Sequence, residues 1–92
     1  MLKAFKVTGH SLFPLYKDGE RVLCIKRFKF TTIKKDDIVV FSKSSYGRMI
    51  KRVTSIKDNK YFVEGTDPLS IDSRNFGAIS LDEIEYRVLF KF

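Results

Sequence analysis

The 92-residue chain has little of what covalent or metal-based stabilisation requires: one cysteine, one histidine and two prolines, with no tryptophan. Cys24 has no partner for an internal disulfide, and Cys24 with His10 alone cannot supply the four ligands of a structural zinc site. No apolar run approaches the roughly 18 residues of a membrane-spanning helix, and residues 1–10 lack the apolar block of a signal peptide. The sequence therefore predicts no disulfide, no metal site and no transmembrane segment.

What the chain does contain is enough apolar material for a folded core. Hydrophobic residues make up 43% and include nine Phe and four Tyr, which excludes an intrinsically disordered tail. Ninety-two residues suit one domain, so we expect residues 1–92 to form a single unit. The net charge of +7 favours contact with nucleic acid, anionic lipid or acidic protein without selecting among them.

Alternation of apolar and polar residues with a period of two dominates the sequence. It is clearest over 84–92, where one face of a half-buried strand would carry Ile84, Tyr86, Val88, Phe90 and Phe92. Four further segments rich in Val, Ile, Phe and Tyr are also predicted strands: 21–26, 37–41, 48–56 and 60–64. Asp58 and Asn59 would turn a hairpin between the last two.

No window of 11 residues has a clear apolar stripe with the 3.6-residue period of a helix. Candidates are 11–16 and the segment opened by Ser80, where Ser80 and Glu83 have capping-box spacing. The predicted fold class is mainly β: a compact, folded antiparallel sheet or partial barrel with at most one or two short helical turns.

Three segments carry residues of chemical interest: Gly-His-Ser-Leu-Phe-Pro at 9–14, Met-Ile-Lys-Arg-Val at 49–53, and Ser-Ile-Asp-Ser-Arg at 70–74 within 65–77. In this order they resemble the motifs of the type I signal peptidases, whose serine/lysine dyad is shared with the self-cleaving SOS-response repressors. The matching residues are Gly9, Ser11, Pro14, Ile50, Lys51, Arg52, Val53, Ser70, Asp72, Ser73, Arg74, Phe76 and Gly77. The third segment favours the signal-peptidase branch, because the repressors lack it.

The resemblance implies a serine endopeptidase in which Ser11 is the nucleophile and Lys51 the general base, with no cofactor. A lysine can act as a base only if burial lowers its pKa from about 10.4. Alternation places Met49 and Val53 on the face of Lys51, and no acidic residue lies within three positions of it. The alternative is a solvated lysine on an edge strand, the usual environment of lysines.

The turn around Ser11 suits a nucleophile. Gly9 and Pro14 favour a tight turn with an exposed hydroxyl and a backbone N–H free to face a developing oxyanion. The alternative is an ordinary turn or N-cap serine. His10 occupies the variable position of the motif, so we do not expect it to be catalytic. Leu12 replaces the usual Met of the family, in a substrate-facing or packing position, and we expect Leu12 and Pro14 to contact substrate.

The resemblance also assigns supporting roles to the third segment. Ser70 would orient the lysine amine by a hydrogen bond, and Asp72 would pair with Arg74 to fix the loop that also contains Ser73. The alternative for Asp72 and Arg74 is a surface salt bridge worth about 0 to 1 kcal/mol. Gly77 would supply a permissive backbone angle.

Some positions depart from the family pattern and leave other functions open. The departures at Leu12, Asp36 and Thr66 also allow a catalytically inactive peptide-binding module of the same fold. A third reading is a basic surface for nucleic acid or anionic membrane, formed by Lys26, Arg27, Phe28, Lys29, Phe30, Lys34 and Lys35. Basic runs are more often solvated, so nucleic acid is disfavoured.

The expected partner is a protein or peptide substrate, and the expected assembly a monomer or weak dimer. Membrane-bound signal peptidases carry an N-terminal anchor, whereas here the first motif begins nine residues from Met1. We therefore expect a soluble minimal relative in the cytoplasm, or a membrane-associated protein if an anchor precedes these residues.

Overall fold

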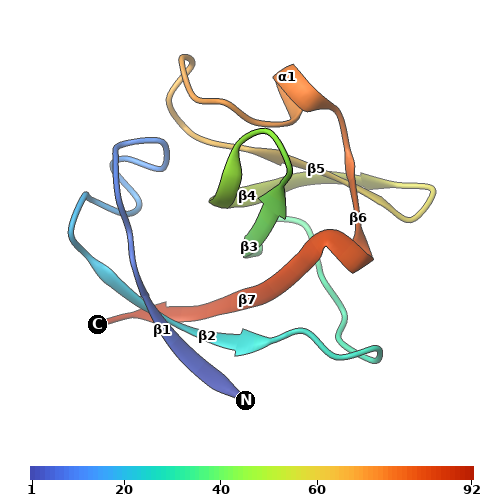
Figure 1. The fold of residues 1–92 in the computed structure, drawn as a ribbon, viewed down its shortest axis with the longest axis horizontal. Helices are drawn as coiled ribbons and strands as arrows, with labels where there is room; N and C mark the ends of the chain where they lie inside the picture. Colours follow the sequence, from blue (N-terminus) through green and yellow to red (C-terminus); the bar gives the residue numbers. More distant parts are fainter.

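The computed structural model describes residues 1–92 as one seven-stranded antiparallel sheet with two single-turn helices (Figure 1). The strands are β1 (Leu2–Lys6), β2 (Arg21–Lys26), β3 (Ile38–Lys43), β4 (Gly47–Lys57), β5 (Lys60–Glu64), β6 (Ile79–Ser80) and β7 (Ile84–Lys91). Their order in the sheet is β1-β2-β7-β3-β4-β5-β6, so β1 and β6 are its edges and the sheet is not closed into a barrel. The predicted mainly β fold is confirmed. No helix of the structure is long and apolar enough to cross a membrane.

The five predicted strands form β2, β3, β4, β5 and β7, with bounds that agree within two residues at each end. Asp58 and Asn59 connect β4 to β5 with positive φ angles of 52° and 61°, as a two-residue hairpin requires. β1 and β6 are strands that the sequence pattern did not predict. The predicted helix at 11–16 is wrong, because these residues form consecutive turns without a regular helix.

Each helix begins at a capping box. Ser80 and Glu83 cap the 3₁₀-helix η1 (Leu81–Glu83), as their spacing predicted. The short helix α1 (Ser73–Phe76) begins after Asp72, whose carboxylate accepts from the Arg74 N–H while the Asn75 side chain accepts from the Asp72 N–H.

The folded sheet has a hydrophobic cluster on each of its two faces. The larger cluster covers β3 to β6 and contains Ile33, Val39, Phe41, Val53, Val63, Ile79 and Ile84. The smaller cluster lies on the consecutive strands β1, β2, β7 and β3 and contains Val7, Val22, Cys24 and Val40. Cys24 is a free, buried thiol, as expected for a core residue. Burial raises its pKa to about 11.

Strand β7 departs from the predicted alternation because register shifts occur where it pairs with β3 and β2. Ile84 packs in the larger cluster, whereas Tyr86 and Val88 pack against the smaller one. Phe90 and Phe92 are exposed. The prediction that these five residues share one face is therefore wrong: the two bulges distribute them over different faces.

Candidate active site

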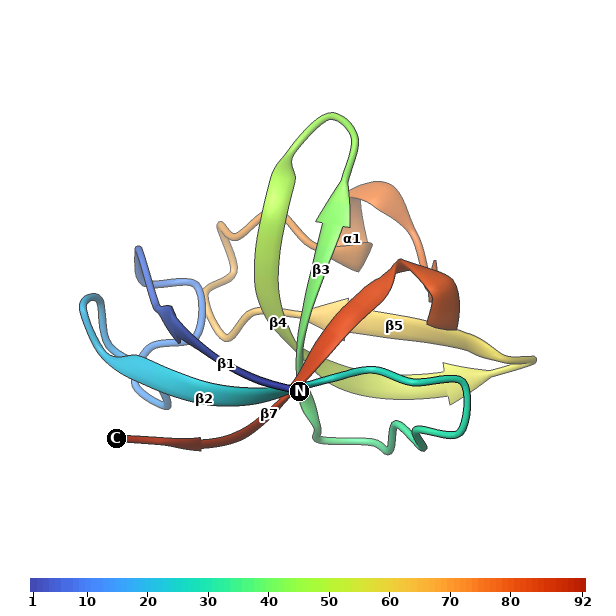
Figure 2. The same ribbon diagram turned by 60° about the horizontal axis from the view of Figure 1, so that its bottom comes forward.

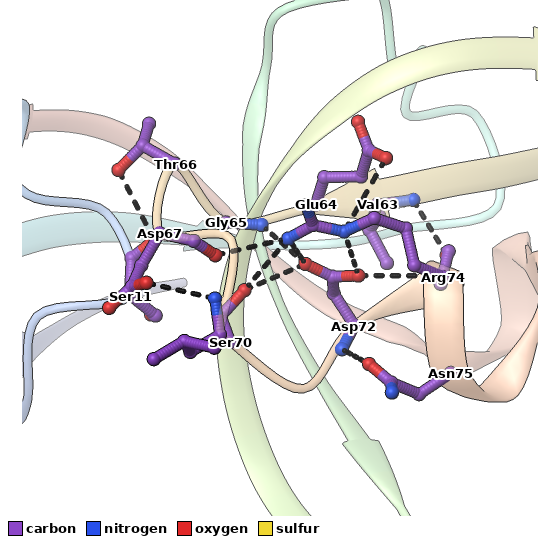
Figure 3. A network of polar contacts seen from close by, with 12 residues as sticks. Ser11, Val63, Glu64, Gly65, Thr66, Asp67, Ser70, Asp72, Arg74 and Asn75 are labelled. Atoms are coloured by element: carbon purple, nitrogen blue, oxygen red, sulfur yellow. Dashed lines mark hydrogen bonds and ion pairs between the residues drawn. The ribbon is translucent and has the colours of Figure 1, made fainter.

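Ser11 lies in the turn that follows β1, and the segment 65–70 holds its backbone in place. The Ser11 carbonyl accepts hydrogen bonds from the Thr66 N–H at 2.6 Å and the Asp67 N–H at 3.2 Å (Figure 3). The Thr66 hydroxyl also donates to this carbonyl, at 3.3 Å. By contrast, the Ser11 hydroxyl and the Ser11 N–H make no hydrogen bond within the chain. The carbonyl is anchored while the groups required for nucleophilic attack and oxyanion binding are unengaged.

Gly65 allows the close approach of the two segments. A Cβ atom at this position would overlap the Ser11 carbonyl oxygen and would come within 2.7 Å of the Ser70 hydroxyl oxygen. Only glycine fits this approach without a shift of the backbone. The sequence analysis missed this role of Gly65, and it also missed the anchoring role of Thr66 and Asp67.

Lys51 is buried in β4, with a side chain that is only 4% exposed. It shares its face of the strand with Val53 of the larger cluster and with Met49, which packs against that cluster. The shared face is the one that alternation predicted, and it points inward. The amine makes no ion pair within 4.0 Å and no hydrogen bond. Burial lowers the pKa of Lys51 from its ordinary value, opposed by Asp72 and Asp67 and assisted by Arg74. The alternative of a solvated edge lysine is excluded.

Asp72 and Arg74 form the predicted ion pair. Their carboxylate and guanidinium meet at 2.6 Å and 2.9 Å, and the Asp72 side chain is 0% exposed. Asp72 also accepts from the Gly65 N–H at 3.0 Å and the Ser70 hydroxyl at 2.7 Å. Burial alone would raise the pKa of Asp72, but these donors hold it well below its usual range. The alternative of a surface salt bridge is therefore wrong for this pair.

The two serines of the third segment have different partners. The Ser70 hydroxyl donates to Asp72 and accepts from Arg74 at 3.2 Å, with no hydrogen bond to Lys51. Its orienting effect on the amine stays a prediction. Ser73 is buried and its hydroxyl oxygen accepts from the Val63 N–H at 2.8 Å, which fixes the start of α1 against β5.

The remaining predicted residues take up mostly structural positions. Leu12 is 1% exposed, so it packs in the interior and presents no surface to a substrate. Pro14 is exposed. Gly9 has a φ of 85° and its N–H donates to the Asp18 carboxylate at 2.8 Å, which shapes the turn before Ser11. Gly77 has the permissive angle that was predicted, with a φ of 83°. Asp36 adopts a φ of 75°, a conformation that usually favours glycine.

The segment 65–72 interacts with both candidate catalytic residues, Ser11 and Lys51. It contacts Ser11 through backbone hydrogen bonds, and its Asp67 and Asp72 act electrostatically on Lys51. Ser11 and Lys51 therefore border the same loop, although they are 40 positions apart in the sequence. No group of three or more His, Cys, Asp or Glu side chains could hold a metal ion.

A groove with two unpaired strand edges runs alongside these residues. β1 pairs only with β2, and residues 47–51 of β4 pair only with β3, because the pairing with β5 begins at Arg52. A pocket of about 250 Å³ lies between the two free edges and is lined by Phe5, Lys6, Val7, Thr8, Val40, Arg48, Met49 and Ile50. On one side the lining runs from Phe5 to Thr8, three positions before Ser11. On the other side it runs from Arg48 to Ile50, one position before Lys51.

No family model matches the chain, and no curated protein matches it in sequence. The interpretation of the site therefore depends on the residues and geometry described above.

Proposed function

We propose that the protein is a serine endopeptidase in which Ser11 attacks the scissile carbonyl and Lys51 acts as the general base. The observation that carries this proposal is the state of Lys51: a buried amine without an ion pair or hydrogen bond, beside the loop that holds Ser11. Burying an amine without a partner is costly and lowers its pKa, which is the change that a lysine base needs. Resemblance of the three segments to the signal-peptidase motifs supports the same roles.

The reaction would proceed in two steps that share one base. Neutral Lys51 Nζ accepts the Ser11 hydroxyl proton as Oγ bonds to the carbonyl carbon, and then gives this proton to the leaving amine. This leaves an ester on Ser11. Lys51 next takes a proton from water as the water oxygen attacks the ester, and returns the proton to Ser11 Oγ as the acid product leaves. The free Ser11 N–H is a donor for the oxyanion in both steps.

Arg74 has an indirect part in this scheme. It neutralises the Asp72 carboxylate with a bidentate pair, so Asp72 is less able to hold Lys51 in its charged form. We therefore regard Asp72 and Arg74 as positioning residues.

The groove between β1 and β4 supports an extended substrate. A peptide strand could pair with both free edges, because each presents unpaired backbone N–H and C=O groups. The pocket between them is lined mainly by apolar side chains, and its charged lining residues are Lys6 and Arg48, of which Arg48 pairs with Glu85. We expect substrates with an apolar side chain a few residues before the cleaved bond.

Cleavage of a peptide library tests the proposal. Peptides from a digested proteome are incubated with wild type, Ser11→Ala and Lys51→Met, and new termini are identified by mass spectrometry. Matched controls are Ser45→Ala, in the turn before β4, and Lys57→Met, an exposed lysine at the end of the same strand. We expect cleavage by wild type and both controls and none by the site variants, with a rate that rises with pH as Lys51 loses its proton. Equal cleavage by Ser11→Ala would overturn the mechanism.

The same groove supports one alternative, a peptide-binding module without catalysis. The observation that favours it is the lack of a hydrogen bond between Ser70 and Lys51. Peptides that bind the groove but are not cleaved up to pH 9 would establish this alternative instead.

A further inference from the structure

One face of β1, β2 and the C-terminal part of β7 is apolar and exposed. Cross-strand pairing defines this surface, which we call the outer face, as three rows: Leu2, Ile25 and Arg87; Ala4, Leu23 and Phe90; Lys6, Arg21 and Phe92. Phe90 is 53% exposed, and Leu2 and Phe92 are exposed to a similar extent. The opposite face of the same strands carries Val22 and Cys24 of the smaller cluster. The outer face therefore lies outside the core and is uncovered.

All charges on the outer face are positive. Lys6 and Arg21 form one end of it and Arg87 the other, and no acidic residue lies in the three rows. The Arg87 guanidinium forms no ion pair, and its Nε is buried without a hydrogen-bond partner. By contrast, Lys43 pairs with Glu83 and Arg48 pairs with Glu85 on other parts of the protein.

The loop after β2 extends this surface with aromatic and basic side chains. Phe30 is 85% exposed, with the Lys29 amine over its ring at 5.1 Å, and Phe28 is exposed beside it. The Lys26 N–H bonds to the Met1 carbonyl, which joins the start of this loop to the free end of β1. The N-terminus, β2 and this loop lie at the bottom of the molecule in Figure 1, and Figure 2 turns this side toward the viewer.

We propose that the outer face and the loop around Phe30 dock on an anionic lipid surface. Apolar and aromatic side chains beside basic ones suit the boundary between acyl chains and headgroups, where the rings enter the interface and the cations meet phosphate. A second copy of the chain is disfavoured, because pairing two such faces would oppose cations with cations. Single-stranded nucleic acid fits less well, because Leu2, Leu23 and Ile25 of the outer face are aliphatic and cannot stack on bases.

Binding to vesicles tests this proposal. Cosedimentation is measured with vesicles of phosphatidylcholine containing 30% phosphatidylglycerol and with phosphatidylcholine alone, at low and high salt. We expect binding only to the anionic vesicles, with loss at high salt because surface charges are screened. The double variant Lys6→Gln/Arg21→Gln should weaken partitioning about 30-fold, since each cation contributes about a factor of five or more. Its matched control is Lys57→Gln/Lys60→Gln, which removes the same charge from the β4–β5 hairpin.

Fluorescence measures whether the outer face itself enters the lipid. The chain has no tryptophan, so Phe90→Trp introduces a single probe, and Tyr46→Trp in the β3–β4 turn is a control of similar exposure, at 49%. Lipids with brominated acyl chains should quench the probe at position 90 and leave the probe at 46 unquenched. Absence of binding to anionic vesicles at low salt, equal quenching of both probes, or tighter binding to an oligothymidylate than to the vesicles would each overturn the proposal. So would dimerisation of the free protein that Phe90→Ser abolishes.

Discussion

Replacing Lys51 with methionine should make the protein more stable while it abolishes catalysis. Methionine keeps an unbranched apolar side chain in the space now lined by Met49 and Val53, and it removes the buried amine. Because the pKa of Lys51 is lower in the folded chain than in the unfolded chain, its protonation opposes folding. The destabilisation is greatest below the folded pKa and disappears as the pH rises above the ordinary value of 10.5.

The magnitude follows from the surroundings of the amine. Replacing buried ionic groups by well-packed apolar ones is often neutral or stabilises the protein by about 1 to 4 kcal/mol. For Lys51→Met we expect a stabilisation in the lower part of this range, about 1 to 2 kcal/mol, because Asp72 and Asp67 partly compensate the charge of Lys51. For a domain of this size about 1 kcal/mol raises Tm by about 4 to 8 °C, so Lys51→Met should raise Tm by about 4 to 16 °C at pH 7.

Thermal unfolding followed by circular dichroism at pH 7 and at pH 11 measures this difference. The gain in Tm should be present at pH 7 and largely absent at pH 11. Lys57→Met, at the exposed end of the same strand, should change stability by no more than about 0.5 kcal/mol at either pH. A Lys51→Met variant that is less stable than wild type at pH 7 would refute the reasoning, because it would show that the amine stabilises the fold through a partner.

Two substitutions and one labelling reaction test the loop and the core. Asp72→Asn should lower the free energy of unfolding by about 2 to 3 kcal/mol at pH 7, since the carboxylate accepts five hydrogen bonds, although the partial exposure of Arg74 screens the pair. The pKa of Asp72 is depressed in the folded chain, so urea titrations should show wild type losing this advantage as the pH falls below about 3.9. Gly65→Ala should destabilise by about 1 to 3 kcal/mol and reduce cleavage, because its Cβ overlaps the Ser11 carbonyl; unchanged stability in the same titrations would contradict this. Cys24 should react with a disulfide reagent only after unfolding, since its thiol is buried with a pKa near 11, and a rapid absorbance change in the native protein would show the packing to be wrong.

The sequence predicted best those features that depend on neighbouring residues. Residues 21–26 and 60–64 became strands with the predicted bounds, because dense β-branched and aromatic residues favour strands wherever they pair. The turn at Asp58 and Asn59 was equally local, since both residue types tolerate positive φ. The shared face of Met49, Lys51 and Val53 followed from alternation alone, because no bulge interrupts β4 before Val53.

Features that depend on pairing between distant segments were not predictable in this way. The bulges in β7 arise where it pairs with β2 and β3, and they move Phe90 onto the outer face. β1 lacks a dense apolar run, and it is a strand because it pairs with the backbone of β2. The contact of Gly65 with Ser11 likewise requires two loops to meet, so the sequence around Gly65 carried no sign of it.

The loop that holds Ser11 brings together two ionisable side chains in opposite situations. Asp72 is buried with donors on both oxygens, so it stays charged, whereas Lys51 is buried without any acceptor, so its charged form is disfavoured. The two states depend on each other, because Arg74 pairs with Asp72, the carboxylate that most favours protonated Lys51. A structural salt bridge would need only Asp72 and Arg74. The unpaired amine beside them adds a cost to folding that packing does not explain, and the general-base role that we propose for Lys51 would account for it.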